Sequence, residues 1–254
     1  MTGERGVPES RAGGMSGAEA AELLRTGTLE VVGRLTAASN ATFYAAVSSA
    51  EGEAACVYKP VAGERPLWDF PDGTLAGREV AAFAVSEALG WGVVPPTVHR
   101  DGPFGEGMVQ LWVDADPEVD LVALARDEQS APLRRMAVFD AVINNSDRKI
   151  GHLLPLPGGH LHGCDHGVSF AEDYKLRTVL WQWQGEPLTE EALAGLESLY
   201  GRLEERGGDL SAELDRHLTP PERYALRRRV ELLLEHKVHP YPSPAWPAVP
   251  WPPV

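Results

Sequence analysis

Four charged residues, in the order Lys59, Glu79, Asp147 and Asp165, could together carry out phosphoryl transfer. That chemistry requires one carboxylate to orient the attacking hydroxyl and another to hold the magnesium ion that neutralises the phosphates. It also requires a lysine that reaches the α- and β-phosphates and an acidic residue that keeps this lysine in place. The two aspartates suit the first pair of roles, and Lys59 with Glu79 suits the second. The ordered set therefore indicates an ATP- and Mg²⁺-dependent phosphotransferase.

The elements that carry these residues agree with those roles. Lys59 stands at the end of an apolar strand candidate, and Glu79 lies on the helix candidate that follows it. Asp147 lies in a short charged loop after an apolar helix, whereas Asp165 follows two short apolar segments separated by a Pro-Gly turn. Each residue alone also has a purely structural explanation, because a strand-end lysine is often solvated and Asn-Asn-Ser-Asp is good turn chemistry. The hypothesis depends on the set and its order.

Asp140 precedes this loop and lies in the middle of the apolar helix. A carboxylate at such a position is costly unless it is paired. We expect Asp140 to accept hydrogen bonds from the loop backbone or from Arg148, which would stiffen the loop that carries Asp147.

Two further segments could bind the nucleotide. The turn at 36–42 is small and hydroxyl-rich, so its backbone N–H groups and side chains could lie over phosphates, namely those of Ser39, Asn40 and Thr42. The second segment could form an apolar adenine slot with exposed backbone groups, from Gln110, Leu111, Trp112 and Val113. An ordinary hairpin turn is the alternative interpretation of the first segment, and a buried strand is compatible with the second.

A competing hypothesis uses the histidines between and beside the two aspartates. In an extended strand alternate residues face one side, and imidazole with thiolate is zinc-ligand chemistry. The alternating residues here are His160, His162, Cys164 and His166. Four neighbours along one strand cannot all close on one tetrahedral ion, since zinc sites usually draw on two separated pairs. A zinc-dependent function that uses residues 152–166 remains the alternative hypothesis, with a less suitable arrangement of ligands.

Length and composition limit the partners. The chain has 254 residues, 43% of them hydrophobic, which is enough to bury a sizeable core. Its formal net charge of -14 argues against nucleic acid or an anionic membrane as the main partner. The two cysteines are far apart, and no apolar run reaches membrane-spanning length or forms a signal peptide. We therefore expect a soluble, cytoplasmic protein.

The pattern of apolar residues predicts an α+β chain. A helix starting at a Ser16–Glu19 capping box precedes five strand candidates in a mainly antiparallel sheet, at 29–35, 42–48, 55–61, 93–98 and 107–113. One helix, 75–89, is inserted after the third strand. An acidic connection at 114–120 precedes further helices, predicted at 121–126, from 132, at 190–205 and at 222–237. The predicted divisions are a disordered N-terminus at 1–14, a nucleotide-binding sheet region at 15–113, a helical region with the catalytic and metal-binding loops at 114–238, and a proline-rich tail at 239–254 that is a surface strap or disordered.

The ordered set and its flanking sequences resemble a known family. The matching segments are VYKP at 57–60, the helix with Glu79, GVVPPT at 92–97, QLWV at 110–113, DAVINNSDR at 140–148 and DHGVSF at 165–170. They resemble the phosphatidylinositol 3-/4-kinase-like branch of the protein-kinase superfold, above all the type II phosphatidylinositol 4-kinases and a group of actinobacterial proteins similar to them. The resemblance implies a protein-kinase-like two-lobed fold with an antiparallel-sheet N-lobe and a mostly helical C-lobe. It also implies that Lys59 binds the α/β-phosphates, Glu79 fixes Lys59, Asp147 is the catalytic aspartate and Asp165 binds magnesium.

Two departures from the family pattern bear on the activity. The family has an asparagine metal ligand where this chain has His152, and magnesium prefers oxygen ligands, so manganese is the alternative ion. The segment between Pro60 and the Glu79 helix is short and has no cysteine, unlike the lipidated insert of the membrane-bound lipid kinases. We therefore expect a soluble protein or small-molecule acceptor instead of a membrane lipid. A nucleotide-binding pseudokinase or regulatory protein without turnover is a further alternative, because of His152.

Overall fold

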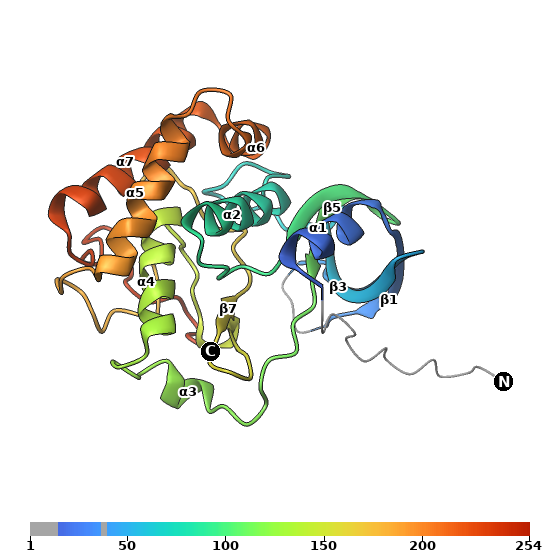
Figure 1. The fold of residues 1–254 in the computed structure, drawn as a ribbon, viewed down its shortest axis with the longest axis horizontal. Helices are drawn as coiled ribbons and strands as arrows, with labels where there is room; N and C mark the ends of the chain where they lie inside the picture. Colours follow the sequence, from blue (N-terminus) through green and yellow to red (C-terminus); the bar gives the residue numbers. More distant parts are fainter. Residues whose placement is uncertain (1–14, 37–39) are drawn as a thin grey trace.

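A five-stranded antiparallel sheet forms the N-lobe of the computed structural model, which describes residues 15–36 and 40–254 (Figure 1). The order of the strands in the sheet is β1-β2-β3-β5-β4. Their bounds are β1 Thr28–Arg34, β2 Phe43–Ser49, β3 Gly52–Pro60, β4 Thr97–Gly102 and β5 Gly105–Leu111. The prediction of a mainly antiparallel five-stranded sheet is confirmed, whereas the disorder predicted for residues 1–14 lies outside the described residues.

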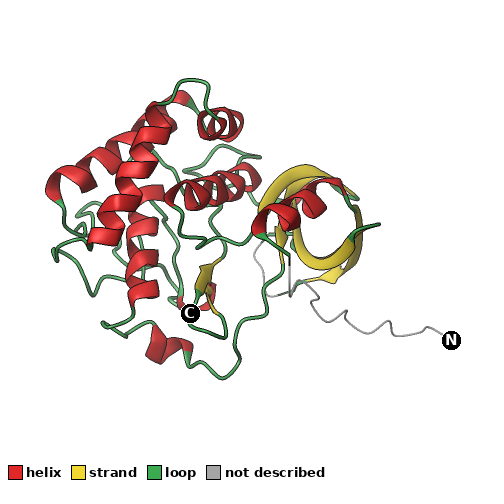
Figure 2. Ribbon diagram, in the orientation of Figure 1, coloured by secondary structure: helices red, strands yellow, loops and turns green. Residues whose placement is uncertain are grey.

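Two helices accompany the sheet. Helix α1, Gly17–Thr26, begins at the predicted capping box, in which the side chains of Ser16 and Glu19 satisfy each other's backbone N–H groups. Its apolar face packs on the sheet through Leu24, which is fully buried. Helix α2, Leu75–Leu89, follows β3 and lies between the sheet and the helical lobe (Figures 1 and 2). Because α2 contacts both lobes and is buried on nearly all sides, its position is fixed from both directions.

The C-lobe is mostly helical (Figure 2). Its core is one large cluster of buried apolar side chains centred on α4, with Phe139, Val142 and Ile143 fully buried. A two-stranded hairpin, β6 Leu153–Pro155 and β7 Leu161–Gly163, separates the loop of Asp147 from that of Asp165. The helices are α3 Leu121–Leu124, α4 Ala131–Ile143, α5 Glu190–Glu204, α6 Asp209–His217 and α7 Pro220–His236.

Two details of the sequence prediction are wrong. The fourth strand was predicted at 93–98, but β4 begins at Thr97, because Pro95 and Pro96 have no backbone N–H to donate to a neighbouring strand. Helix α6 was not predicted. It follows two glycines and buries only Leu210 and Leu214, so its apolar pattern is too short to stand out.

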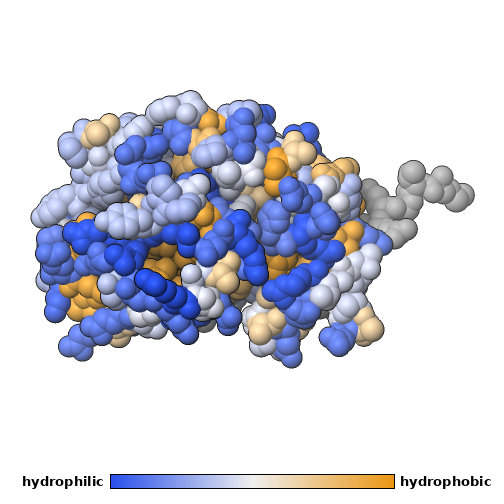
Figure 3. Space-filling view, turned by 90° about the horizontal axis from the view of Figure 1, so that it is seen from above, coloured by the Kyte–Doolittle hydropathy of each residue, from blue (hydrophilic) through white to orange (hydrophobic). Residues whose placement is uncertain are grey.

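The surface is mixed in character. Figure 3 shows hydrophilic residues over most of one face, with apolar residues in patches between them. Among the helices of the described part of the chain, none combines the length and the apolar character needed to cross a membrane.

Gly107 provides a test of how the sheet positions Lys59. A Cβ atom at Gly107 would lie 2.3 Å from the backbone oxygen of Lys59, the neighbour of its strand partner Pro60. We expect Gly107→Ala to push β5 away from β3 and to lower the free energy of unfolding by about 1–3 kcal/mol, the usual cost of overpacking. Urea unfolding measures this loss. Gly52→Ala, at the start of β3 where it pairs with β2, meets no atom within 4 Å and should leave stability unchanged or slightly higher; equal losses in the two variants would contradict the argument.

Candidate active site

Lys59 connects the two lobes through two carboxylates. Its Nζ lies 2.8 Å from Glu79 Oε1 and 2.6 Å from Asp165 Oδ1. Burial alone would lower the pKa of Lys59, but the charges of Asp165 and Glu79 outweigh it and raise the pKa above its ordinary value. Conversely, the charge of Lys59 holds the pKa of Asp165 well below its usual range. Lys59 is therefore a fixed cation, and Asp165 is a fixed anion, at neutral pH.

Glu79 holds the loop of Asp165 as well as Lys59. Its other oxygen, Oε2, accepts a hydrogen bond of 2.8 Å from the backbone N–H of His166. Only 2% of the Glu79 side chain is exposed, so both bonds are shielded from water. The residue that follows, Gly167, lies close to the first turn of α2, where an added Cβ would be 3.3 Å from Leu75 Cβ. One helix thus sets the positions of the lysine and of the Asp165 loop together.

Asp147 lies in a tightly folded loop after α4. Asn144 ends the helix in the left-handed conformation, with a φ of 54°, and its side-chain amide donates to the carbonyls of Ala171 and Asp173. The Asn145 side-chain oxygen accepts a hydrogen bond of 3.0 Å from the backbone N–H of Asp147. These bonds fix the loop from both sides and so restrict the position of Asp147.

The Asp147 carboxylate is partly shielded but not locked. Its Oδ2 lies 3.2 Å from Lys149 Nζ, and 31% of its side chain is exposed. Burial raises the pKa of Asp147 above its ordinary value, although Lys149 opposes the shift. A carboxylate of raised pKa that remains open to the cavity can accept a hydrogen bond from an incoming hydroxyl.

Arg148 connects the two loops, and its side chain is fully buried. Its guanidinium forms a bidentate pair with Asp140, with distances of 2.8 Å and 2.9 Å to the two oxygens. It also donates to the Cys164 carbonyl at 3.1 Å and lies 2.7 Å from His166 Nε2. The expected pairing of Asp140 with Arg148 is confirmed. The pair positions the residues that flank both Asp147 and Asp165.

Five of the predicted residues line one small cavity of about 200 Å³, namely Asn40, Lys59, Glu79, Asp147 and Asp165, whereas His152 is not part of its lining. Ligand pockets typically measure about 300–1,000 Å³. This cavity therefore suits phosphate groups and not a complete nucleotide. Arg65, which the sequence analysis did not single out, also lines it.

The other predicted nucleotide-binding residues lie elsewhere or lack a free group. Ser39 lies outside the described residues, and Thr42 is buried, with its hydroxyl 3.4 Å from the Asn40 carbonyl. The Gln110 side chain is also buried and donates to Thr97 Oγ1 at 2.8 Å. None of the four residues predicted for the adenine slot belongs to the lining of the small cavity.

The backbone of that slot is partly engaged within the sheet. The N–H of Leu111 donates to the Pro96 carbonyl at 2.9 Å, and the N–H of Trp112 donates to the Ala55 carbonyl at 3.0 Å. Within the described part of the chain, the Val113 backbone makes no such bond. An adenine ring would therefore depend on Val113 and on the carbonyl groups of this connection.

The donor groups near Asp165 fit a divalent ion. His152 Nε2 lies 3.6 Å from Asp165 Oδ2, and burial lowers the pKa of His152 to about 4, which leaves its ring nitrogen neutral. Magnesium is usually held by one or two protein groups, with phosphate oxygens and waters completing its shell. Asp165 with His152 would provide those protein groups once phosphates drew Lys59 away.

The zinc alternative is not supported. Among the described residues, no three histidine, cysteine or acidic side chains are arranged to hold a metal ion. His160 bonds to the Gly92 carbonyl, whereas His166 faces Arg148, and Cys164 Sγ lies 3.8 Å from the His152 carbonyl. The alternation read from the sequence ends because β7 covers only Leu161–Gly163.

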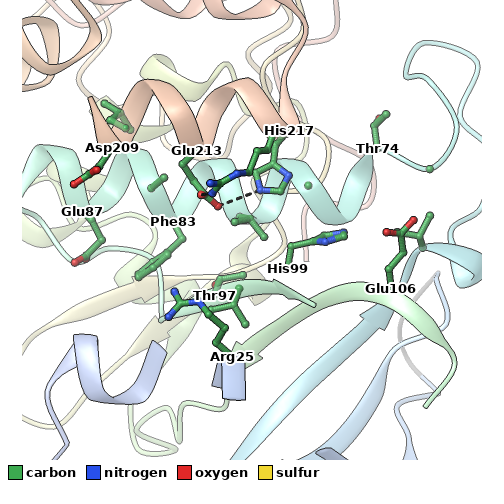
Figure 4. A pocket seen from close by; sticks show the side chains of 18 of the residues that line it. Arg25, Thr74, Phe83, Glu87, Thr97, His99, Glu106, Asp209, Glu213 and His217 are labelled. Atoms are coloured by element: carbon green, nitrogen blue, oxygen red, sulfur yellow. Dashed lines mark hydrogen bonds and ion pairs between the residues drawn. The ribbon is translucent and has the colours of Figure 1, made fainter. Parts of the chain in front are cut away.

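A second cavity, of about 720 Å³, lies between α2, α6 and β4 (Figure 4). Figure 4 shows His217 and Glu213 of α6 facing His99 of β4 across it. His217 packs on α2 at Gly77, where a Cβ would lie 3.0 Å from its Nδ1. Among the described residues that line this 720 Å³ cavity, none is a predicted site residue. We therefore place the site in the smaller cavity with the carboxylates.

Comparison with known proteins identifies relatives in sequence and in fold. The chain is 44% identical over 264 aligned positions to Protein Rv2133c of Mycobacterium tuberculosis, and the match covers 91% of this chain and 94% of that protein. The chain belongs to the same family as this protein. No family model matches the sequence.

Two solved structures share the fold. The structure of hydra Fam20 with sugar has a TM-score of 0.54 and 15% identity, covering 86% of this chain and 87% of that one. The Helicobacter pylori proinflammatory kinase CtkA has a TM-score of 0.50 and 12% identity, covering 85% and 94%. With the antiparallel N-lobe sheet and the helical C-lobe, these matches confirm the predicted protein-kinase-like α+β fold. At such low identity they establish the fold and not the phosphatidylinositol 3-/4-kinase-like class.

The buried pair of Arg148 and Asp140 gives a direct prediction. We expect Arg148→Met to lower the free energy of unfolding by about 3–5 kcal/mol, because it leaves the Asp140 charge buried without its partner. Denaturant unfolding measures the loss. The matched control is Lys149→Met, which removes the adjacent cation from its partly exposed pair with Asp147 and should cost about 0–1 kcal/mol. Similar stability of the two variants would show that the buried pair does not hold the loop.

Proposed function

We propose that the protein is an ATP- and Mg²⁺-dependent phosphotransferase of the phosphatidylinositol 3-/4-kinase-like class, acting in the cytoplasm on a soluble protein or small molecule. The observation that carries the proposal is the double contact of Lys59 with Glu79 and Asp165, beside Asp147 in one cavity. A cation, its anchoring carboxylate and two further carboxylates at such a site are the groups that phosphoryl transfer requires.

Each residue has one task in this proposal. Lys59, held by Glu79, binds the α- and β-phosphates, and Arg65 adds a second positive charge to the lining of the same cavity. Asp165 with His152 holds the metal ion, which neutralises phosphate charge when bound. Asp147 accepts a hydrogen bond from the acceptor hydroxyl and orients its oxygen toward the phosphate. Asn40 and the connection at 110–113 contact the remainder of the nucleotide.

Nucleotide binding tests the central assignment. We expect Lys59→Met and Asp165→Asn each to weaken MgATP binding by about tenfold or more, equal to at least about 1.4 kcal/mol of lost interaction. Asp147→Asn should bind MgATP as well as the wild type and lose phosphoryl transfer. Thermal shift and titration calorimetry measure binding, and Lys237→Met, at the distant end of α7, is the control. Equal shifts with MgATP in the wild type, Lys59→Met and Asp165→Asn would remove the assignment.

His152 favours a second candidate, a nucleotide-binding pseudokinase that acts through a partner. In the family pattern an asparagine oxygen contacts the metal at this position, and an imidazole nitrogen is a poorer magnesium ligand. If the protein is an enzyme, we expect wild-type turnover to be higher with Mn²⁺ than with Mg²⁺, and His152→Asn to reduce that ratio. Turnover assays with each ion in the two proteins measure the ratio. If the wild type bound ATP but its turnover were no higher than that of Asp147→Asn, the result would support the pseudokinase instead.

A further inference from the structure

The C-terminal tail runs beside the loop of Asp147. The backbone N–H of Ile150 donates to the Pro253 carbonyl at 2.9 Å, and the N–H of Thr178 donates to the Ala248 carbonyl at 3.0 Å. Residues 177–179 in turn pair with Arg148 in a short parallel bridge. The tail is thus an extra extended segment along the catalytic loop, and its end lies next to the small hairpin in Figure 1.

The groove recognises the tail through its carbonyl groups. Trp181 donates its indole N–H to the Ala248 carbonyl at 2.8 Å, in addition to the two backbone donors. In each of these bonds the folded domain is the donor and the tail is the acceptor. Four prolines in this part of the tail have no N–H to offer: Pro247, Pro250, Pro252 and Pro253. Aromatic and N–H groups that face the carbonyls of an extended proline-rich segment are the usual means of binding such peptides.

The side chains of Trp246 and Pro250 hold the tail against the folded domain, whereas Trp251 is exposed. Trp246 stacks on Trp68 of the N-lobe loop with ring centroids 5.9 Å apart, and the buried Lys175 ammonium lies 4.8 Å from the Trp246 ring centre. Trp68 is still 84% exposed, and Trp251 is 86% exposed. Apart from the Trp246 anchor and the buried Pro250, the last residues are held through their carbonyl groups, so loss of the anchor should favour local release of the tail.

We propose that this groove, formed by residues 148–150 and 177–181, binds an extended proline-containing segment of a polypeptide acceptor, and that the protein's own tail at 246–253 occupies it as a competitor. The inference rests on the proposed function, because the groove begins at Arg148, directly after Asp147. A polypeptide in the place of the tail would run past this carboxylate and could present a hydroxyl side chain to it. Release of the tail would then be required before transfer to such an acceptor.

Peptide binding tests the groove without any nucleotide. The probe is a fluorescently labelled peptide with the sequence of residues 244–254, added to the full chain. A tethered tail has an effective concentration of about 1 mM, so the wild type should bind the peptide weakly. Trp246→Ala removes the anchor and should bind the peptide about tenfold more tightly. Trp251→Ala, which changes an exposed tail residue of the same type, should bind like the wild type. Equal peptide affinity in Trp246→Ala and wild type, or no binding by either, would overturn the proposal.

Hydrogen exchange provides a measurement that does not require a stable variant. In the wild type, the amides of Ile150 and Thr178 should exchange together and faster than those of α4, because detachment of the tail alone exposes them. If the amides of Ile150 and Thr178 exchanged only when the whole protein unfolds, the tail would not leave the groove, and the proposal would be overturned. Peptide binding without MgATP binding would uphold the groove and contradict the proposed function, so the two failures are distinguishable.

Transfer assays identify the acceptor class. With a proline-containing polypeptide that carries serine and threonine, Trp246→Ala should lower KM for the polypeptide and leave ATP affinity unchanged. An unchanged KM, or transfer confined to small-molecule acceptors, would show that the groove does not receive the acceptor.

Discussion

The buried ion pair of Asp140 and Arg148 is the interaction on which the site depends. Both side chains have no exposed surface, and a buried pair is favourable only when its geometry and remaining hydrogen bonds are satisfied. Here the guanidinium also contacts the Cys164 carbonyl and the His166 ring, so its donors are used on both sides. The pair therefore fixes the distance between the loop after α4 and the loop after β7. Asn145 and Glu79 hold each loop separately, and the buried pair sets the two loops relative to each other.

Glu79 extends this arrangement to the other lobe. One of its oxygens binds Lys59 of the sheet, and the other binds the backbone N–H of His166. Since His166 also touches Arg148, a continuous set of short polar contacts runs from the N-lobe to α4. Helix α2 holds these contacts in place because it is buried on most sides and can move little. Its Arg78 also pairs with the buried Glu222 of α7. The site is thus held by polar groups that are shielded from water, where each hydrogen bond is strong.

Local signals in the sequence were sufficient to predict part of the fold and to select part of the candidate site. The lysine at a strand end, the glutamate on the following helix and the two loop aspartates could be ordered because each follows from periodicity and turn chemistry within one element. The pairing of Asp140 with Arg148 followed from the cost of an isolated buried charge. The antiparallel sheet and the helical lobe were predicted for the same reasons. Each of these inferences uses neighbours that are close in sequence.

Contacts between distant segments could not be predicted in that way. Gln110 was expected at the nucleotide, but its partner is Thr97 on the adjacent strand, a register that only the folded sheet defines. Arg65 enters the cavity through a loop with no periodicity. For the tail, the sequence allowed either a strap along the surface or disorder. A proline-rich segment favours an extended conformation in both cases, so composition does not decide between them. The course of the tail along Thr178 and Ile150 depends on donors 70 and 103 residues away in the sequence.

The salt bridge of Lys59 with Asp165 connects these constraints to function. The two groups neutralise each other across the cavity, and the Asp165 side chain is 54% exposed, so their direct contact is partly screened by solvent. Because the Asp165 carboxylate is accessible, its contact with Lys59 can be exchanged for others of the same charge type. In the proposed function, phosphate oxygens would replace the carboxylate as partners of Lys59, and a divalent ion would replace the ammonium as the partner of Asp165. The more deeply buried Glu79 would keep the lysine in place during that exchange.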